Sequence, residues 1–149
     1  MNSVRTSSTD QDFIALVKLL DQELAIVDGD DHAFYHQFNS IDVLKHTIVL
    51  YENNIPVGCG AIKKFDDTSA EVKRMYTLTE TRGKGVATKV LLELEKWAKE
   101  LNYKYTILET GKRLPDAIAL YQKNGYEIIP NYGQYVGIEN SVCFRKELE

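Results

Sequence analysis

One segment in the middle of this chain constrains its fold more than any other. Residues 69–78 alternate with the period of two that is typical of a strand. This alternation puts Val72, Arg74 and Tyr76 on one expected face. A glycine-rich turn, ETRGKG, follows, and residues 85–101 then repeat apolar side chains at intervals of three and four, which predicts a long amphipathic helix. A strand that turns directly into a long helix leaves several amide groups unpaired at the start of the helix, so this turn is a candidate binding site.

The other elements follow from the same two periodicities. Apolar residues recur at steps of three and four from Phe13 to Val27, which predicts a first helix. Thr9, with Asp12 three positions later, gives the signal of an N-cap for this helix. Residues 28–38 are acidic and then aromatic, which is typical of a short helix or a loop. Further strand patterns lie at residues 3–6, 47–51, 55–62, 105–110, 125–129 and 141–146, and a helix pattern runs from Pro115 to Lys123.

Two turn signals complete the predicted order of elements. Asn53 and Asn54 predict a hairpin, because asparagine tolerates the left-handed backbone that such turns require. Gly125 is expected to end the helix before it. The resulting order, βααβββαβαββ, predicts an α+β fold with a mixed central sheet of about seven strands, flanked on both faces by about four helices. No repeat or linker divides the chain, so a single domain of residues 1–149 is expected.

The composition favours an ordinary globular protein. The hydrophobic fraction is 44%, the charged fraction is 27% and the formal net charge is −4. A chain of this charge is not expected to attract nucleic acid or anionic lipid broadly. No apolar run has the length of a membrane span and the N-terminus has no apolar signal core, so the expected location is the cytoplasm. Cys59 and Cys143 belong to no CxxC pair and are expected to be free thiols.

The glycine-rich turn has the chemistry of an anion site. Gly83 and Gly85 lack a Cβ, which lets main-chain amides approach an anion closely. Arg82 and Lys84 add positive charge at the same point. The spacing does not fit a Walker loop, and Lys89 occupies the third glycine position of a Rossmann turn. Glycine and charge alone leave two interpretations equally open: a phosphate site, and an ordinary helix start with solvated basic residues.

Several motifs together resemble one known family. Arg82-x-x-Gly85-x-Ala87 is similar to the Arg/Gln-x-x-Gly-x-Gly/Ala signature of the GNAT acyltransferases. AEVKRMYTLTETRGKGVA resembles the fourth strand and pyrophosphate loop of that family, and AIALYQKNGYEII resembles its late helix and sixth strand. The order of predicted elements is also that of the family, so the resemblance covers about residues 3–147 and implies a GNAT-like acyl-CoA N-acyltransferase fold. LETG, LYQKNGY and PNYGQY look most like a bacterial small-molecule branch.

The resemblance implies that acetyl-coenzyme A is the acyl donor. Its pyrophosphate is expected at Arg82, Gly83, Lys84, Gly85, Val86, Ala87 and Thr88. Its pantetheine arm is expected along the fourth strand, at Met75, Tyr76, Thr77 and Leu78. Main-chain amides of this strand are expected to polarise the thioester carbonyl. In the family, the fourth and fifth strands diverge, and the thioester projects into the gap between them.

The resemblance also implies two catalytic groups, a base for the amine and an acid for the departing thiolate. Glu71 stands eleven positions before Arg82, which is the spacing of the carboxylate that many relatives use as base. A solvated position beside Lys73 is an equally open interpretation of Glu71. Glu109, on the facing strand, is the reserve base. Tyr121 matches the tyrosine that protonates the coenzyme sulfur in the family, and this role is preferred to that of a core aromatic.

One position departs from the family pattern. Many relatives carry asparagine three residues before the alanine of the late helix, where it contacts the pantetheine. Counting back from Ala117 gives Leu114. Either Arg113 or Asp116 supplies this contact instead, or the contact is absent.

The residues that face the acceptor are less well defined. Tyr35, Phe38, Tyr132 and Tyr135 are candidates for the wall of an acceptor pocket, together with Glu109, although such aromatic residues more often simply pack. His32 and His36 have a spacing that can hold a metal. Because no further ligands cluster with them, solvent-facing histidines and no metal are expected.

The sequence therefore predicts an N-acetyltransferase that moves acetyl from acetyl-coenzyme A directly to a primary amine of a small molecule, in a ternary complex. A cationic amine suits the acidic surface. The enzymatic alternative is a protein N-terminal or lysine acetyltransferase. Two alternatives without catalysis are an acyl-CoA-binding regulatory module and a phosphate-binding structural protein. No nucleic acid or membrane partner is expected, and a homodimer stays open beside a monomer.

Overall fold

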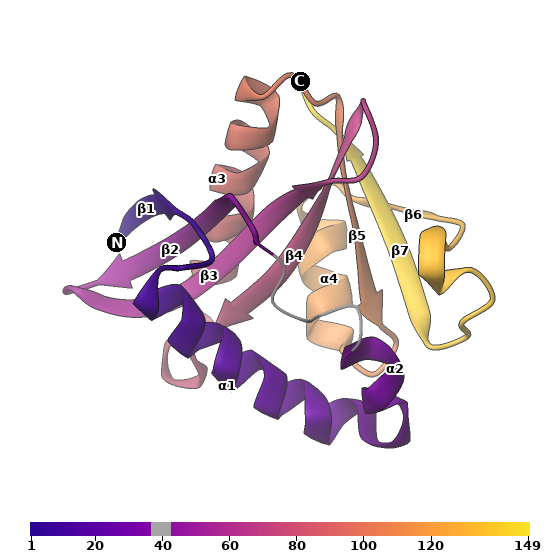
Figure 1. Cartoon of the computed structure of the whole chain (residues 1–149), viewed down its shortest axis with the longest axis horizontal. Coiled ribbons are helices and arrows are strands. Elements are labelled where there is room, and N and C mark those ends of the chain that lie inside the picture. Colours follow the sequence, from indigo (N-terminus) through magenta and orange to yellow (C-terminus); the bar gives the residue numbers. More distant parts are fainter. Residues whose placement is uncertain (37–42) are drawn as a thin grey trace.

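A mixed β-sheet forms the centre of the protein (Figure 1). In the computed structural model, which describes residues 1–36 and 43–149, seven strands lie in the order β1-β2-β3-β4-β5-β7-β6. The strands are β1 (Asn2–Thr6), β2 (His46–Glu52), β3 (Ile55–Lys64), β4 (Ser69–Thr77), β5 (Tyr105–Gly111), β6 (Glu127–Ile129) and β7 (Ser141–Glu147). The α-helices are α1 (Gln11–Asp28), α2 (His32–His36), α3 (Val86–Glu100) and α4 (Pro115–Lys123), and the 3-10 turns are η1 (Gly29–Asp31), η2 (Thr79–Thr81) and η3 (Gly133–Tyr135). The predicted α+β fold, with about seven strands and four helices, is confirmed.

Helices cover both faces of the sheet. Helix α1 crosses one face over β2, β3 and β4, and α3 and α4 lie on the opposite face (Figure 1). Val90, Leu91 and Leu94 of α3 are fully buried against the sheet. Burial of each such side chain contributes about 1.5–3 kcal/mol to folding, so the stripe predicted for this helix holds it in place. No helix in the described part of the chain is both long and apolar enough to cross a membrane.

The apolar stripe of α1 serves two purposes. Phe13, Leu16 and Val17, in its first half, are buried against β2, β3 and β4. Leu20 and Leu24, in its second half, are only half-buried and line a cavity. The stripe therefore anchors the helix at one end and leaves an apolar wall at the other.

The local turns agree with the sequence except at the start of α1. Asp10, and not Thr9, is the N-cap, so that prediction was wrong. The carboxylate of Asp10 accepts hydrogen bonds from two amides of the first turn, at 2.9 and 3.0 Å, and its charge suits the positive end of the helix. Asn53 and Asn54 adopt left-handed φ values of 52° and 66°, which confirms the hairpin. Gly125, with φ of 89°, follows the last turn of α4 as predicted.

Strand β4 contains a bulge that the alternation pattern does not predict. Arg74 has a φ of 59°, and the register with β3 shifts at Gly60. The extra residue reverses the alternation, so the guanidinium of Arg74 lies on the α1 side, 2.9 Å from a carboxylate oxygen of Asp21. Val72 packs in the core on the α3 side and Tyr76 packs on the α1 side. The expectation that Val72, Arg74 and Tyr76 share one face was therefore wrong.

A glycine in the neighbouring strand lies opposite the bulge. A Cβ at Gly60 would lie 2.6 Å from Sδ of Met75 and 2.8 Å from Cδ1 of Leu94. A side chain at this position would therefore overlap core side chains beneath the bulge unless they moved.

Strands β4 and β5 pair in parallel over only three residue pairs, from Ser69 with Tyr105 to Glu71 with Ile107. Beyond Glu71 the strands diverge (Figure 1), while β5 stays paired with β7 along its whole length. The predicted gap between these two strands is therefore confirmed. The gap leaves one edge of β4 without a strand partner in the middle of the sheet.

Candidate active site

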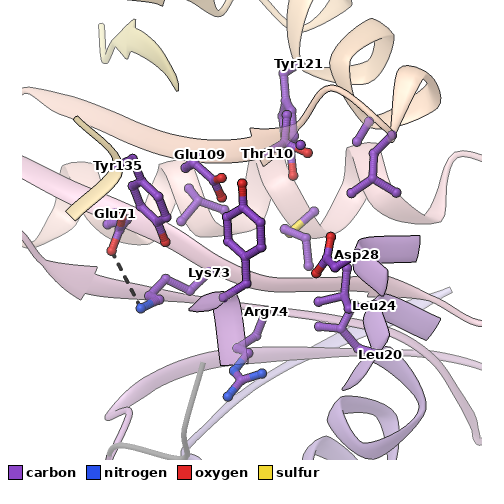
Figure 2. Close-up of a pocket in the computed structure, with 16 residues that line it drawn as sticks. Leu20, Leu24, Asp28, Glu71, Lys73, Arg74, Glu109, Thr110, Tyr121 and Tyr135 are labelled. Atoms are coloured by element: carbon purple, nitrogen blue, oxygen red, sulfur yellow. Dashed lines mark ion pairs between the residues drawn. The ribbon is translucent and has the colours of Figure 1, made fainter. Parts of the chain in front are cut away.

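A cavity of about 160 Å³ lies where β4 and β5 diverge. Figure 2 shows Leu20 and Leu24 of α1 on one side of it and Tyr121 of α4 on the other. Residues 71–75 of β4 and the end of β5 form the remaining walls. The carboxylates that line it belong to Asp28, Glu71 and Glu109, and the cationic residues that line it are Lys73 and Arg74.

Glu109 has the environment of a general base. Burial raises the pKa of its carboxyl group to about 7, although a hydrogen bond from the Ser141 hydroxyl acts in the opposite direction. Oγ of Ser141 donates to Oε2 of Glu109 at 2.7 Å. Among the described residues, no group forms a hydrogen bond with Oε1, the other oxygen. A carboxylate with a pKa near 7 and a free oxygen can take a proton from an amine at neutral pH.

Glu71 is held more tightly than Glu109. Its Oε2 accepts a hydrogen bond of 2.6 Å from the hydroxyl of Tyr132, and Nζ of Lys73 lies 3.8 Å from its Oε1. Both oxygens therefore have partners. The buried position of Glu71 does not fit the alternative of a solvated strand residue.

Tyr121 is packed in the core and also reaches the cavity. Its ring packs edge-on against Tyr126, at 5.8 Å between centroids, and is tilted against Phe144 at 6.0 Å. Burial raises the pKa of the phenol, so the group keeps its proton. No described residue forms a hydrogen bond with this hydroxyl, and it is not among the polar atoms sealed from solvent. The hydroxyl is therefore available to a group inside the cavity.

The glycine-rich turn is open to solvent. Residues 82–85 are exposed, Gly83 and Gly85 have φ values of 85° and 81°, and the space beside both α-carbons is empty within 4 Å. Gly85 is the N-cap of α3, with no side-chain cap and no acidic residue in the first turn. Within the described part of the chain, no group accepts a hydrogen bond from the amides of residues 83–88. Free amides at the positive end of a 15-residue helix form a ready site for phosphate oxygens.

The basic side chains of the turn have acidic neighbours. A guanidinium nitrogen of Arg82 lies 2.7 Å from a carboxylate oxygen of Glu23, and Nε of Arg82 donates to the carbonyl of Thr77 at 3.0 Å. Nζ of Lys84 lies 3.5 Å from a carboxylate oxygen of Glu52. Both basic side chains are about half exposed, so they can turn toward an anion at the loop.

The four residues expected to follow the pantetheine arm differ in their surroundings. Met75 lines the cavity. Tyr76 is buried under α1, and the amide of Leu78 already donates to the carbonyl of Val57 at 2.8 Å. Because amides alternate along a strand, the amide of Thr77 points to the opposite side, toward the gap. Met75 and Thr77 are thus the members of this set best placed for contact with a molecule in the gap.

The residues expected around an acceptor gather near the cavity in part. Tyr35 and Tyr135 line it, and their rings are stacked with centroids 6.5 Å apart. Tyr132 lies behind Glu71 and packs edge-on against Phe65. Phe38 lies outside the described residues.

Leu114, at the position that departs from the family pattern, gives the cavity an apolar side chain. Leu114 lines the cavity and precedes α4 without capping it by its side chain. Arg113 is bound elsewhere, because its guanidinium pairs with the carboxylate of Asp31 at 2.9 Å and donates to the carbonyl of Asp28. Asp116 is exposed. Arg113 therefore connects the end of α1 and the turn η1 to the start of α4.

Three polar residues of the site carry no sequence motif. Asp28 and Lys73 line the cavity, and Ser141 bonds to Glu109. Ser141 lies 32 residues from Glu109, on β7, which pairs with β5. Knowledge of this strand pairing was needed to find it, because serine at the start of a strand is common.

The described residues contain no group of three or more His, Cys, Asp and Glu side chains that could hold a metal. The side chains of His32 and His36 lie outside the described part of the structure. Cys59 and Cys143 are free and buried, and burial raises the pKa of their thiols to about 12 and about 11. Neither thiol is suited to act as a nucleophile at neutral pH.

Comparison with protein families matches residues 13–126 to the Acetyltransferase (GNAT) family. The uncharacterized N-acetyltransferase YjgM of Escherichia coli K12 is 39% identical over 85 residues, which are 55% of this chain and 50% of that protein. The uncharacterized N-acetyltransferase YsnE of Bacillus subtilis 168 is 33% identical over 100 residues, which are 66% of each chain. The chain thus spans about half to two thirds of the length of these relatives.

A solved structure extends the similarity to the whole fold. A protein from Klebsiella pneumoniae subsp. pneumoniae MGH 78578, described as an acyl-CoA N-acyltransferase, superposes with a TM-score of 0.83 at 28% identity, over 99% of this chain and 97% of that one. A GNAT family acetyltransferase from Elizabethkingia anophelis, solved with acetyl-CoA bound, has a TM-score of 0.70 at 18% identity, over 99% of this chain and 97% of that one. The second similarity concerns the fold alone.

Proposed function

Because the chain belongs to the GNAT family of acetyltransferases, we propose that it transfers acetyl from acetyl-coenzyme A directly to a primary amine of a small molecule. The single observation that carries this proposal is the position of Glu109. Its carboxylate lines a cavity at the divergence of β4 and β5, and burial raises its pKa to about 7. The open amides at Gly83 and Gly85 supply an anion site at the start of α3.

The coenzyme is held at two places in this proposal. Its phosphates bind the amides of residues 83–88, with Arg82 and Lys84 as charged partners. Its pantetheine arm lies in the gap beside Met75 and Thr77, where β4 has a free edge. A thioester between these two strands reaches the cavity that Glu109 and Tyr121 line.

The reaction then needs a neutral amine, because an ammonium group has no lone pair to attack a carbonyl. Glu109 takes one proton from the ammonium group, and the amine forms a C–N bond with the carbonyl carbon of the thioester. The C–S bond breaks as the tetrahedral intermediate collapses, and Tyr121 gives a proton to the sulfur. Tyr121 regains a proton from the nitrogen of the new amide. One proton remains on Glu109 for each acetyl group transferred.

Glu109 is preferred to Glu71 as the base in this proposal. Both oxygens of Glu71 have partners, whereas Oε1 of Glu109 has none among the described residues. Glu71 and Asp28 still serve the reaction, because their charges attract an ammonium group to the cavity. This assignment reverses the order of preference drawn from the sequence.

A small acceptor fits the cavity better than a folded protein does. The cavity is only about 160 Å³, smaller than the roughly 300–1,000 Å³ of typical ligand pockets. The pair of Arg113 with Asp31 ties η1, which directly follows α1, to the start of α4. Tyr35 and Tyr135 narrow the remaining side. A peptide acceptor needs an open groove at this position.

The test measures thiol release from acetyl-coenzyme A with a panel of small primary amines and, in parallel, with peptides that carry a free N-terminus or lysine. We expect release above background with at least one small amine, and less with every peptide. Titration calorimetry with acetyl-coenzyme A and with ATP at equal concentrations measures coenzyme preference. Tight coenzyme binding without release for any acceptor would favour a regulatory module, and equal binding of ATP would favour a general phosphate site.

A second experiment tests the choice of base. The matched variants Glu109→Gln and Glu71→Gln each remove one carboxylate and keep the side-chain volume. We expect Glu109→Gln to lower kcat by roughly 100-fold or more, as for loss of a general base, and Glu71→Gln to act mainly through KM for the amine. The opposite pattern would return the role of base to Glu71.

A further inference from the structure

A continuous chain of hydrogen bonds leads away from Glu109 to the far side of the cavity wall. Oγ of Ser141 lies 2.7 Å from Oε2 of Glu109, and the hydroxyl of Tyr35 lies 3.0 Å from Oγ of Ser141. Nδ2 of Asn140 lies 3.2 Å from the same tyrosine hydroxyl. These hydrogen bonds join β5, β7 and α2, which are far apart in sequence.

The directions of these bonds follow from the number of hydrogens. The single hydrogen of the Ser141 hydroxyl is donated to Glu109, so the Tyr35 hydroxyl must donate to Ser141. The amide of Asn140 then donates to Tyr35. All three hydrogens point toward the carboxylate, which is the arrangement that stabilises its ionised form. When Glu109 takes a proton, the two hydroxyl hydrogens can turn around and point the other way.

The far end of the chain reaches a second cavity. This cavity has a volume of about 590 Å³ and is lined by Asp31, Arg113 and Asn140 among others. Among the described residues, Tyr35 is the one that lines both cavities. Tyr35 and Asn140, at the far end of these hydrogen bonds, therefore line a space outside the proposed acetyl-transfer site.

We propose that Ser141 and Tyr35 form a hydroxyl relay that carries the proton from Glu109 to the second cavity. The proposal rests on the proposed function with Glu109 as base. The carboxyl group of Glu109 first turns to bring its protonated oxygen to Ser141, and both hydroxyl hydrogens turn away from Glu109. Glu109 then donates its proton to Oγ of Ser141, Ser141 passes its own hydrogen to the Tyr35 oxygen, and Tyr35 releases its hydrogen to water or buffer. One O–H bond breaks and one forms at each hydroxyl, and both hydroxyls end neutral. The relay provides an exit when coenzyme and amine fill the first cavity and block direct access of water.

The titratable and charged groups that face Glu109 come from every element packed against it. These groups are Asp28 of α1, Glu71 and Lys73 of β4, Tyr121 of α4, Tyr135 of η3 and Cys143 of β7. None of them forms a hydrogen bond with Ser141 or Tyr35 in the described part of the structure. Ser141 and Tyr35 are buried hydroxyl groups without a charge of their own, so they conduct the proton without holding it.

The test compares Tyr35→Phe and Ser141→Ala with Tyr51→Phe. Tyr51 is a matched control, because its hydroxyl donates to Asp12 at 2.6 Å and lines neither cavity. In dilute buffer we expect Tyr35→Phe to lower kcat at least fivefold with less than a twofold change in KM for the amine. Imidazole or another small buffer is expected to restore much of this kcat as its concentration rises, whereas Tyr51→Phe keeps the original kcat at every concentration. Ser141→Ala is expected to lower kcat and also to move the acid limb of the pH profile to higher pH, because Ser141 no longer donates to Glu109.

Several results overturn the relay. One is an unchanged kcat in both Tyr35→Phe and Ser141→Ala, and another is a loss in Tyr35→Phe that no buffer concentration reverses although the variant melts at the original temperature. If Tyr35→Phe melts at a lower temperature than the original chain, Tyr35→His is the variant to compare, because histidine can also accept and donate a proton. The relay is rejected if Tyr35→His does not recover kcat. Turnover in the unsubstituted chain without any effect of Tyr35→Phe refutes the relay and leaves the acetyltransferase proposal standing. No turnover with any amine removes both proposals.

Discussion

Replacement of Gly85 by valine tests the coenzyme site most directly. Gly85 caps α3 with a φ of 81°, and no atom lies within 4 Å of the position that a Cβ would take. A β-carbon at this position therefore meets no neighbouring atom in the free protein, and the strain of the substitution comes from the backbone conformation alone. A valine side chain is expected to crowd the amides of the first turn, where the proposed pyrophosphate binds.

Two separate free energies follow from this geometry. The left-handed backbone penalises a side chain at Gly85 by about 1–2 kcal/mol. For a chain of this size, that penalty lowers the melting temperature by roughly 2–8 °C. Displacement of the phosphate from two amides removes two charge-assisted hydrogen bonds, each worth about 1.5–3 kcal/mol. The loss of about 3–6 kcal/mol corresponds to an increase in Kd for acetyl-coenzyme A of at least 100-fold.

Gly137 supplies the matched control. It has a φ of 78° and no atom within 4 Å of its own Cβ position, but it lies between η3 and β7, outside the glycine-rich turn. Gly137→Val is expected to lower the melting temperature about as much as Gly85→Val and to leave the coenzyme Kd within twofold. Titration calorimetry with acetyl-coenzyme A and thermal unfolding followed by circular dichroism measure the two quantities. The reasoning fails if Gly85→Val binds the coenzyme normally, or if Gly137→Val weakens binding equally.

Three further predictions concern the chemistry of the site. Tyr121→Phe is expected to lower kcat about tenfold or more with coenzyme Kd within threefold, and unchanged steady-state kinetics would remove the phenol from the mechanism. Arg82→Ala is expected to raise the Kd for acetyl-coenzyme A about tenfold and to make that Kd less sensitive to salt. Titration at two ionic strengths measures both effects. An unchanged salt dependence of the Kd would exclude a phosphate contact for Arg82. For Glu109, kcat/KM is expected to rise with pH through about 7 as the carboxyl ionises. The pKa of Glu109 is higher in the folded protein than in the unfolded chain, so the folded state binds this proton more tightly. The contribution of Glu109 to stability therefore falls as pH rises from about 4.5 to about 7. Glu109→Gln should melt at a higher temperature than the original chain at pH 8, and a lower melting temperature would contradict the assignment.

The sequence predicts the elements of this fold well where one periodicity dominates. Helix α3 and the strands around it were found because their buried residues recur at regular intervals. The bulge at Arg74 was missed because it inserts one residue without any local signal at that position. The residue in the sequence that accompanies the bulge is Gly60, and Gly60 lies on the neighbouring strand β3. Periodicity describes one element at a time, whereas a bulge is a property of a strand pair.

The same limit applies to the candidate site. The glycine-rich turn and Tyr121 were identified because their motifs are contiguous, and whether they act as proposed stays a prediction. The preference for Glu71 over Glu109 came from spacing along one strand, and spacing carries no information on burial or partners. Tyr132 reaches Glu71 across 61 residues and Tyr35 reaches Ser141 across 106. Such contacts determine which carboxylate is free, and only the folded arrangement reveals them.

The divergence of β4 and β5 gives the sheet an exposed hydrogen-bonding edge in its interior. Unpaired strand edges ordinarily invite other chains to add a strand, and this is a common origin of aggregation. Here α1 lies on one face of the sheet and α4 on the other (Figure 1), which limits the room for an added strand along that edge. The same unpaired backbone groups that would invite another strand at an outer edge of the sheet thus lie between two helices, where only a narrow extended molecule is expected to reach them.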